Sequence, residues 1–386
     1  MTEHFIDIAY KSVNKVNEVL CGDTVEVVRE NDKTILVLAD GLGSGVKANI
    51  LSTMTCKIAS TMLKEGESVL ETIDTIMHTL PVCKVRNLAY STFAIIDISN
   101  DGLCNIIEYD NPPVFILRNN HLLELKKETM IYEDKKVFLT SFQMELGDQL
   151  VVVSDGVIHA GVGGIMNLGW QWEHVADFLK KESRLYKSAE RIATALLDAC
   201  NILYDFKPGD DTTVASIILR APETVDLFSG PPENSAGDAD FVRQFVQSPG
   251  KKVVCGGTAS NIVAKNLNTE VETSLDYLTP DIPPIGHIKG IDLVTEGVLT
   301  LSKSVELIRR YRHQEHINLN AQDGATRLSK LLIEDCTHIN FWIGSAINPA
   351  HQNPDFPSTL SIKRSILNEL IQLLQQLGKV IHIHYI

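Results

Sequence analysis

The chain has 386 residues, of which 44% are hydrophobic and 22% are charged. This composition is typical of a globular protein, and the length suffices for two or three domains. The formal net charge of -14 argues against a nucleic acid or an anionic membrane as the main partner, because both select for Lys and Arg. We therefore expect neither partner.

The N-terminal residues combine no basic region with an apolar core, so no signal peptide is expected. No apolar run reaches the roughly 20 residues that a membrane-spanning helix needs. The seven cysteines are scattered and form no CxxC pair, which argues against a disulfide framework and against a structural zinc site. A cytoplasmic location is the default expectation.

Up to about residue 220, short strand candidates are separated by Gly, Asn, Asp and Pro turns. In chain order these candidates are residues 23–30, 33–40, 91–99, 104–110, 113–119, 121–127, 148–155 and 212–220. Helical spacing of apolar residues predicts helices over Val46–Leu63 and Ser68–Leu80, and a third between about Glu173 and Tyr204. Consecutive strands with helices in separate blocks indicate antiparallel sheets covered by helices.

The middle of residues 221–250 is rich in Pro, Gly, Ser and acidic residues, which predicts a linker between domains at 1–220 and 251–386. The second domain alternates strands and helices. Its strand candidates are residues 251–255, 290–297, 337–344 and 379–386, and its helix candidates are residues 256–267, 298–311, 325–335 and 366–378. This alternation predicts a smaller α/β domain.

Several acidic residues of the first domain lie where a predicted strand begins or ends. Asp40 and Asp155 each end an apolar strand and precede Gly, whereas Asp23, Asp210 and Asp211 stand just before strands. A single Asp-Gly pair is usually a turn, but these residues converge if the strand ends share one edge. Converging carboxylates raise each other's pKa unless a cation lies between them. Oxygen ligands favour Mg²⁺ or Mn²⁺ over zinc.

Three stretches in this order, ADGLGSGVKA, VVSDGV and PGDDTTVASI, resemble the metal-dependent protein phosphatases of PPM type, in particular their SpoIIE-like branch. The resemblance covers about residues 5–220. It implies an α+β fold, a two-sheet antiparallel sandwich flanked by helices, with two Mn²⁺ or Mg²⁺ ions at one end. It also implies hydrolysis of phosphoserine or phosphothreonine by a metal-activated water. The implied partner is a bacterial signalling phosphoprotein, such as an antagonist of an anti-sigma factor.

The same resemblance assigns roles by motif position. Asp40 would bridge the two metals, Gly41 would offer its carbonyl oxygen, and Asp155 and Asp210 would be further ligands, so that these aspartates carry catalysis. Two other acidic residues, Asp23 and Asp211, would act from a second layer around the metals.

The sequence departs from the family pattern at two points. Leu42 stands where many members have a His proposed as general acid, as is typical of the SpoIIE-like branch, whose residue there is Met. The Arg that clamps phosphate near the family's N-terminus has no evident match. The general acid is therefore unassigned, and the metals alone could hold the substrate phosphate.

Two strand-to-helix turns of the second domain are candidates for ligand binding: Gly256, Gly257 and Thr258 in one, and Thr295 and Glu296 in the other. Amide groups at a helix start bind anions, and parallel neighbouring strands would bring both turns to one sheet edge. Such turns also need glycine for purely structural reasons.

We expect a small anionic ligand at these turns, nucleotide-like or sugar-like, and a role for the second domain as a sensor or interaction module. The alternative function for the whole chain is a ligand-sensing regulatory protein with a weak or inactive phosphatase domain.

Overall fold

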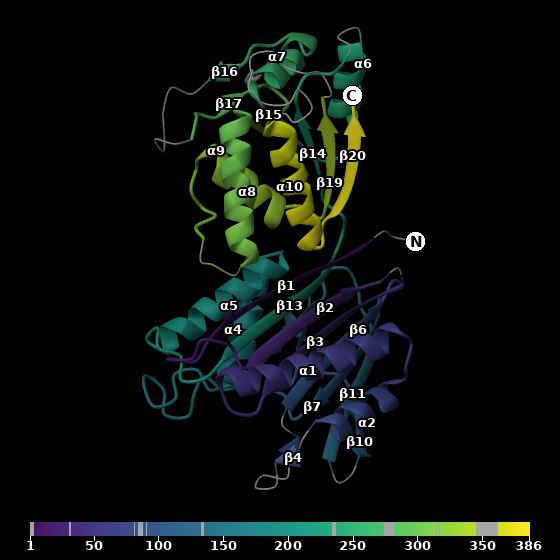
Figure 1. Ribbon diagram of the computed structural model, residues 1–386, viewed down its shortest axis with the longest axis vertical. Coiled ribbons are helices and arrows are strands. Elements are labelled where there is room, and N and C mark those ends of the chain that lie inside the picture. The colour runs from purple at the N-terminus through teal and green to yellow at the C-terminus, as the bar shows by residue number, and fades with distance from the viewer. Residues whose placement is uncertain are drawn as a thin grey trace. The chain divides into compact units, whose positions relative to one another are not determined.

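The structure is a computed structural model that describes residues 4–30, 32–80, 82–83, 88–89, 91–132, 135–233, 237–273, 282–313, 315, 317–344 and 362–386. Contacts divide the chain into two compact units, Met1–Ala221 and Pro222–Ile386, and each is described by itself (Figure 1). Among the helices of the described ranges, none is both long and apolar enough to cross a bilayer.

The N-terminal unit is built on two antiparallel sheets. The strands of one are β1 (Phe5–Val13), β8 (Phe115–Arg118), β9 (His121–Leu122), β12 (Gln149–Val153) and β13 (Thr212–Arg220), in the order β1-β13-β12-β8-β9. The strands of the other are β2 (Asp23–Arg29), β3 (Lys33–Gly41), β6 (Ser91–Ser99), β7 (Leu103–Tyr109), β10 (Glu128–Tyr132) and β11 (Lys135–Gln143), in the order β10-β11-β7-β6-β3-β2. A small separate sheet pairs β4 (Val82–Cys83) with β5 (Leu88–Ala89).

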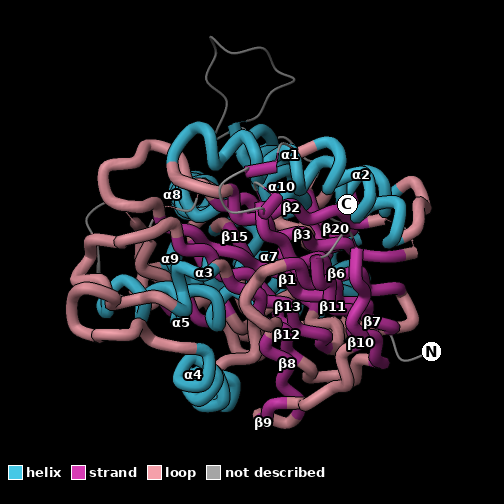
Figure 2. Tube along the Cα trace, turned by 90° about the horizontal axis from the view of Figure 1, so that it is seen from below, coloured by secondary structure: helices cyan, strands magenta, loops and turns pink. Residues whose placement is uncertain are grey.

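Helices cover the outer face of each sheet, so the central strands are buried on both sides. In β3, Leu36 and Leu38 belong to the core between the sheets, whereas Ile35 and Val37 pack under α1 (Gly45–Lys64) and α2 (Val69–Thr79). The other sheet packs against α4 (Trp172–Leu185) and α5 (Ala189–Leu203). Figure 2 shows the strands between these two helix layers. The predicted two-sheet antiparallel sandwich flanked by helices is confirmed.

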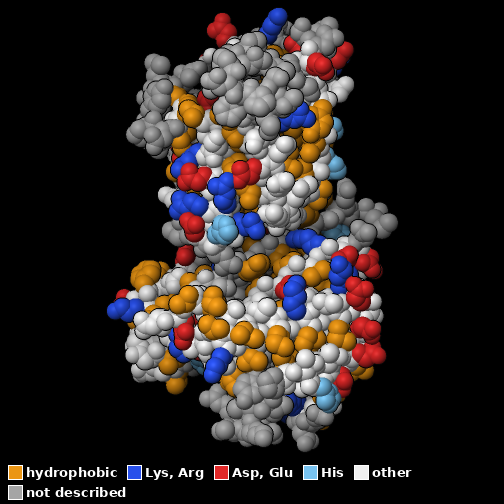
Figure 3. All heavy atoms as spheres, viewed as in Figure 1, with side chains coloured by type: hydrophobic (Ala, Val, Ile, Leu, Met, Phe, Trp, Pro, Cys, Tyr) orange, Lys and Arg blue, Asp and Glu red, His pale blue; other side chains and the backbone are white. Residues whose placement is uncertain are grey.

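Helix α1 is apolar on its outer face as well. Val46, Ile50 and Met54 are 58%, 52% and 41% exposed, and their spacing of four residues places them on one side of the helix. Figure 3 shows hydrophobic side chains over the surface that α1 covers. Apolar spacing therefore predicted that this segment is a helix, but it could not predict which face is buried.

The N-terminal unit differs from the sequence-based prediction in several elements. Strands β1, β4, β5, β10 and β11 were not predicted, and the predicted helix over residues 173–204 is two helices. The break falls at Tyr186, which is extended, and at Ser188, whose hydroxyl accepts from the Arg191 amide at 3.4 Å and starts α5. Strand β1 includes the buried Asp7, which pairs with Arg220 at 3.0 Å, so its buried positions are not all apolar.

The C-terminal unit is a seven-stranded sheet with helices on both faces. Its strands are β14 (Thr224–Ser229), β15 (Lys251–Cys255), β16 (Glu272–Thr273), β17 (Gly286–His287), β18 (Leu293–Thr295), β19 (His338–Ile343) and β20 (Val380–Tyr385). Their order is β16-β17-β18-β15-β14-β19-β20, and the last five in this order run parallel.

The two helix layers bury alternate residues of this sheet. Leu227 and Val253 face α8 (Val298–Arg312), α9 (Gly324–Ile333) and α10 (Ile362–Gln376). Phe228 and Val254 instead face α6 (Asp238–Gln247) and α7 (Gly257–Asn266). A parallel sheet wound with helices on both faces is the α/β architecture that the alternation of elements indicated.

The predicted linker over residues 221–250 is wrong. Residues 224–229 form β14, which pairs with β15 and β19 near the middle of the second sheet, and residues 238–247 form α6. Val225, Leu227 and Phe228 in β14 are fully buried. Their burial makes this segment a strand, although the residues that follow are rich in Pro, Gly and Ser. The boundary between the two units falls in the chain between Ala221 and Pro222.

Candidate metal centre

The two sheets of the N-terminal unit bring the predicted acidic residues together at one end. In the six-stranded sheet, β2 and β3 pair so that Asp23 lies directly opposite Asp40. In the five-stranded sheet, Asp155 opens the short helix α3 (Asp155–Ile158) just beyond β12, while Asp210 and Asp211 lead into β13. Because β12 and β13 are paired neighbours, these three residues share the same end of their sheet.

Hydrogen bonds fix the turn that carries Asp155. The Ser154 amide donates to the Thr213 carbonyl at 3.0 Å, and the Ser154 hydroxyl accepts from the Thr213 amide at 2.9 Å. The hydroxyl of Tyr204, on the cap of α5, donates to the Gly156 carbonyl at 2.7 Å. These contacts hold the start of α3 against the start of β13, so the Asp155 backbone is positioned through Ser154 on one side and Gly156 on the other.

The glycines that follow the two strand-end aspartates are required by close backbone packing. A Cβ on Gly41 would lie 2.0 Å from the Ala48 carbonyl oxygen in α1, and a Cβ on Gly156 would lie 2.1 Å from the Asp211 carbonyl oxygen. Real Cβ contacts are never this short, so a side chain at either position would push apart the elements that carry the carboxylates. The Asp-Gly turns are thus part of the construction of the site.

Burial and mutual repulsion raise the pKa values of these carboxylates. Burial, followed by the charges of Asp23, Asp155, Asp210 and Asp211, raises the pKa of Asp40 to about 9. Burial raises the pKa of Asp23 to about 7, and burial with the charge of Asp210 raises that of Asp155. These raised pKa values mean that the protein's own cations do not offset burial and mutual repulsion at Asp23, Asp40 and Asp155.

The carboxylate oxygens fit a divalent cation. Both side-chain oxygens of Asp23 and Oδ2 of Asp211 are buried without a hydrogen-bond partner in the described part of the chain. Unpaired buried carboxylate oxygens are costly, and hard cations such as Mg²⁺ prefer such oxygens. Among the described residues, however, no three His, Cys, Asp or Glu side chains are placed close enough together to hold one metal ion.

A cation beside the carboxylates was not predicted from the sequence. The Lys15 amide donates to Asp211 Oδ1 at 3.0 Å, and its ammonium lies 3.6 Å from Asp210 Oδ1. The side chains of Lys15 and Asp210 are 38% and 44% exposed, so the ammonium faces both the site and solvent. Lys15 follows β1, a strand that was not predicted, so the sequence had no signal placing it here.

In the C-terminal unit, the two predicted ligand turns are adjacent. Strands β15 and β18 are parallel neighbours, and the Gly256 amide donates to the Thr295 carbonyl at 2.8 Å. Gly256, with φ of 113°, precedes α7, whose first residues are Gly257 and Thr258. The shared sheet edge expected for these turns is therefore present.

The polar groups of the second turn already have partners within the fold. The Glu296 carboxylate accepts from the amides of Val298, Leu299 and Thr300 at 2.8–3.3 Å and so caps the start of α8. The Thr295 hydroxyl donates to the Glu296 carbonyl oxygen at 2.9 Å. The sequence could not distinguish these roles from ligand binding.

Residues 30–220 match the family model of stage II sporulation protein E (SpoIIE). This part of the chain belongs to the SpoIIE family, of PPM type. The chain is 28% identical over 130 residues to stage II sporulation protein E of Bacillus subtilis (strain 168), and this alignment covers 32% of this chain and 16% of that protein. With the Priestia megaterium protein it shares 26% identity over 160 residues, 40% of this chain and 27% of that protein.

A solved structure, the SpoIIE phosphatase domain from Bacillus subtilis in a crystal form without domain swapping, aligns with the chain at 21% identity. The alignment covers 57% of this chain and 95% of that chain, with a TM-score of 0.44. The chain spans less than a third of the length of the two relatives compared above, at 16% and 27%.

Proposed function

We propose that the SpoIIE-family domain is a metal-dependent phosphatase that hydrolyses phosphoserine or phosphothreonine on a bacterial signalling protein. The observation that carries the proposal is the meeting of buried carboxylates from two sheets, with three oxygens of Asp23 and Asp211 left without partners. The family match over residues 30–220 supports it. An antagonist of an anti-sigma factor is the substrate that the family resemblance implies.

The proposed metal ligands are Asp40, the Gly41 carbonyl oxygen, Asp155 and Asp210. Two Mn²⁺ or Mg²⁺ ions bound there would supply a water of lowered pKa and would neutralise charge on a phosphate. Asp23 lies opposite Asp40 on the neighbouring strand, so it can hold further water or ligand atoms in place.

Lys15 is the residue that we assign to the substrate phosphate. Its ammonium is held beside Asp210 but remains partly exposed, and the amide bond to Asp211 fixes its backbone. An ammonium placed at the rim of a carboxylate site attracts the phosphate dianion as a point charge. It thus takes the position of a phosphate clamp that no arginine near the N-terminus supplies.

The alternative is a ligand-sensing protein with a weak or inactive phosphatase domain. It is favoured by the finding that no three potential ligands among the described residues lie close enough together to hold one metal ion. The two proposals differ in one measurable respect. An active domain must hydrolyse phosphate esters in proportion to occupancy of the carboxylates by metal, whereas an inactive domain can bind metal without turnover.

The deciding experiment measures hydrolysis of p-nitrophenyl phosphate and of a phosphoserine peptide by the whole chain, with Mn²⁺, with Mg²⁺ and with EDTA. We expect activity only with metal and a loss of at least about a hundredfold in kcat for Asp40→Asn, because the site loses a charge on which metal activation of water depends. Asp198→Asn, at an exposed position of α5, is the matched control and should retain full activity. Activity in EDTA, or equal activity in Asp40→Asn, would contradict the mechanism. No activity in the wild type under any of these conditions would favour the alternative.

A further inference from the structure

The C-terminal unit contains a cavity of about 560 Å³ at the edge of its sheet. Its walls come from β16, from residues 282–287, from the turn before β18 and from the start of α9. The volume lies within the roughly 300–1,000 Å³ that small-molecule sites occupy. None of the glycine turns discussed above lines it. The cavity is therefore a separate candidate for ligand binding.

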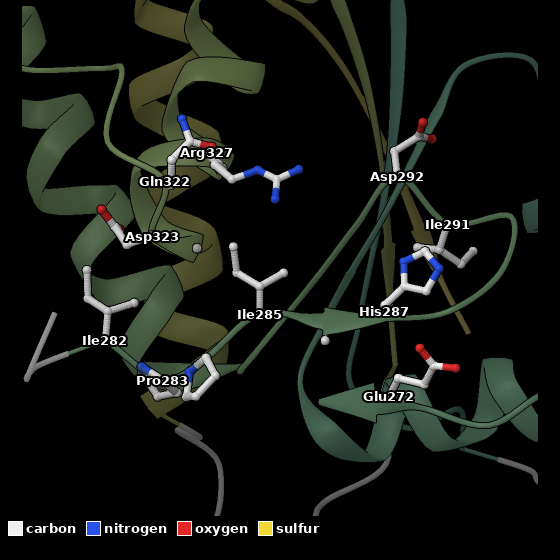
Figure 4. A pocket seen from close by; sticks show the side chains of 13 residues that line it. Glu272, Ile282, Pro283, Ile285, His287, Ile291, Asp292, Gln322, Asp323 and Arg327 are labelled. Carbon is white, nitrogen blue, oxygen red and sulfur yellow. The ribbon is translucent and has the colours of Figure 1, made fainter. Parts of the chain in front are cut away.

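Charges of opposite sign lie on opposite sides of this cavity. Figure 4 shows Arg327 extending from α9, with Glu272 and Asp292 on the side formed by the strands. The side chains of Arg327 and Glu272 are exposed and make no hydrogen bond or ion pair within the described ranges. Asp292 uses Oδ2 to accept from the Lys252 amide at 2.7 Å, which leaves its other oxygen available. Both a cationic and an anionic group can therefore receive a ligand.

The part of the cavity between these charges is apolar. Ile285 lies between the helix side and the strand side in Figure 4. Ile282 and Ile291 also line the cavity and are each only 7% exposed. Because both side chains are buried, this part of the cavity wall is held in place by packing. An apolar group placed there would be removed from water without displacing polar partners.

The balance of charges in the cavity disfavours a multiply charged anion. The side chain of Asp323, which also lines the cavity, is occupied in capping α9 through the Thr326 amide at 2.9 Å. It nevertheless adds a third carboxylate to those of Glu272 and Asp292, against the guanidinium of Arg327 and the imidazole of His287. A nucleotide or a phosphorylated metabolite would gain the contact with Arg327 but would meet three like charges. A ligand that carries one carboxylate and one ammonium satisfies both walls.

We propose that this cavity binds a small zwitterion with an apolar body, namely an apolar amino acid or a short apolar peptide with free termini. The ligand's carboxylate pairs with Arg327, its ammonium pairs with Glu272 and Asp292, and its side chains lie against Ile285. Arg presents a planar fork that matches a carboxylate. This site is separate from the glycine turns, where an anionic ligand stays a prediction, and it is independent of the phosphatase activity.

The experiment is isothermal titration of the whole chain with L-leucyl-L-leucine. Two modified dipeptides serve as probes of the charges: the N-acetyl form lacks the ammonium and the C-terminal amide lacks the carboxylate. We expect binding of the free dipeptide and at least about tenfold weaker binding of each modified form, since each loses a charge-assisted hydrogen bond. ADP serves as the nucleotide probe. Absence of dipeptide binding, or binding of ADP that the dipeptide displaces, would overturn the proposal.

Three variants connect the binding to this cavity. Arg327→Gln should weaken binding of the free dipeptide about tenfold while leaving the amide form unchanged, and Glu272→Gln should spare the N-acetyl form in the same way. Lys330→Gln, one turn further along α9 and outside the cavity lining, is the control and should bind as the wild type does. Because Arg327 and Glu272 are exposed, each variant should have the same melting temperature as the wild type. Dipeptide binding that is equal in all three variants would place the site elsewhere and overturn the proposal.

Discussion

The two units of the chain both place carboxylates at buried positions of their sheets, and they treat them in opposite ways. In the C-terminal unit, Asp226 is fully buried and accepts hydrogen bonds from Ser248, Lys252, Asn340 and Trp342 at 2.7–3.0 Å. Burial raises its pKa, but the hydrogen bonds outweigh burial and the pKa lies below the ordinary value. This carboxylate is complete without any ligand.

In the N-terminal unit, the buried carboxylate of Asp23 has no such set of close partners. Asp23 is only 5% exposed, yet neither of its oxygens has a donor at hydrogen-bond distance among the described residues. Burial raises its pKa to about 7, and the nearby hydroxyls of Ser154 and Thr213 offset only part of that rise. A buried carboxylate whose oxygens all have hydrogen-bond partners contributes to the stability of the fold. A buried carboxylate whose oxygens lack partners can instead bind a cation. The contrast between Asp226 and Asp23 is therefore the physical basis of the functional proposal.

Removing these two carboxylates should have opposite effects on stability without metal. Asp226→Ala leaves the ammonium of Lys252 buried and unpaired and should lower the free energy of unfolding by about 3–5 kcal/mol. Asp23→Asn removes repulsion and should leave stability unchanged or raise it. Calorimetric unfolding in EDTA at pH 8 measures both. A large loss in Asp23→Asn, or none in Asp226→Ala, would remove the distinction between the two sites.

The lysines beside these carboxylates allow the same comparison, with a smaller expected effect. Lys252 is 5% exposed and serves the fold, whereas Lys15 is 38% exposed and lies beside Asp210. Lys15→Met should raise KM for a phosphoserine peptide about tenfold with a smaller change in kcat, because it removes one charged contact to the phosphate. Lys15→Arg should restore most of the affinity, and stability should change little. A KM equal to that of the wild type would show that Lys15 does not contact the phosphate.

Much of this organisation could be predicted from the sequence, because its signals are local. The order of strands and helices predicted antiparallel sheets covered by helices, and the resemblance to PPM-type phosphatases implied the two-sheet sandwich. The acidic strand ends indicated that the aspartates converge, and helical spacing predicted α1 and α2. The linker prediction failed because the average composition of residues 221–250 hides the few apolar residues that form β14.

Other parts of the site depend on contacts between distant residues. The loop after β1 brings Lys15 to Asp211, which lies 196 residues further along the chain, and no local pattern reports such a contact. Glu296 looks the same in the sequence whether it caps α8 or binds a ligand, and only the amide bonds decide between the two. The cavity beside Arg327 likewise combines four separate segments.

The central claim, that the buried carboxylates of the N-terminal unit form a cation site, has a consequence for pH. The pKa of Asp40 is raised to about 9 in the folded chain, against about 3.9 for an unfolded aspartate. Between these values the folded state binds more protons than the unfolded state, so stability without metal must fall as pH rises through this range. A bound divalent cation replaces the protons and should remove most of that fall.

The most direct test follows the melting temperature of the wild type and of Asp40→Asn from pH 6 to pH 9, in EDTA and in Mn²⁺. In EDTA the wild type should lose stability as pH rises, and Mn²⁺ should raise its melting temperature most at pH 8–9. Asp40→Asn should show a shallower loss and little response to Mn²⁺, because the neutral side chain neither repels its neighbours nor holds the ion. A wild type that does not respond to Mn²⁺, or a variant that responds equally, would contradict the account.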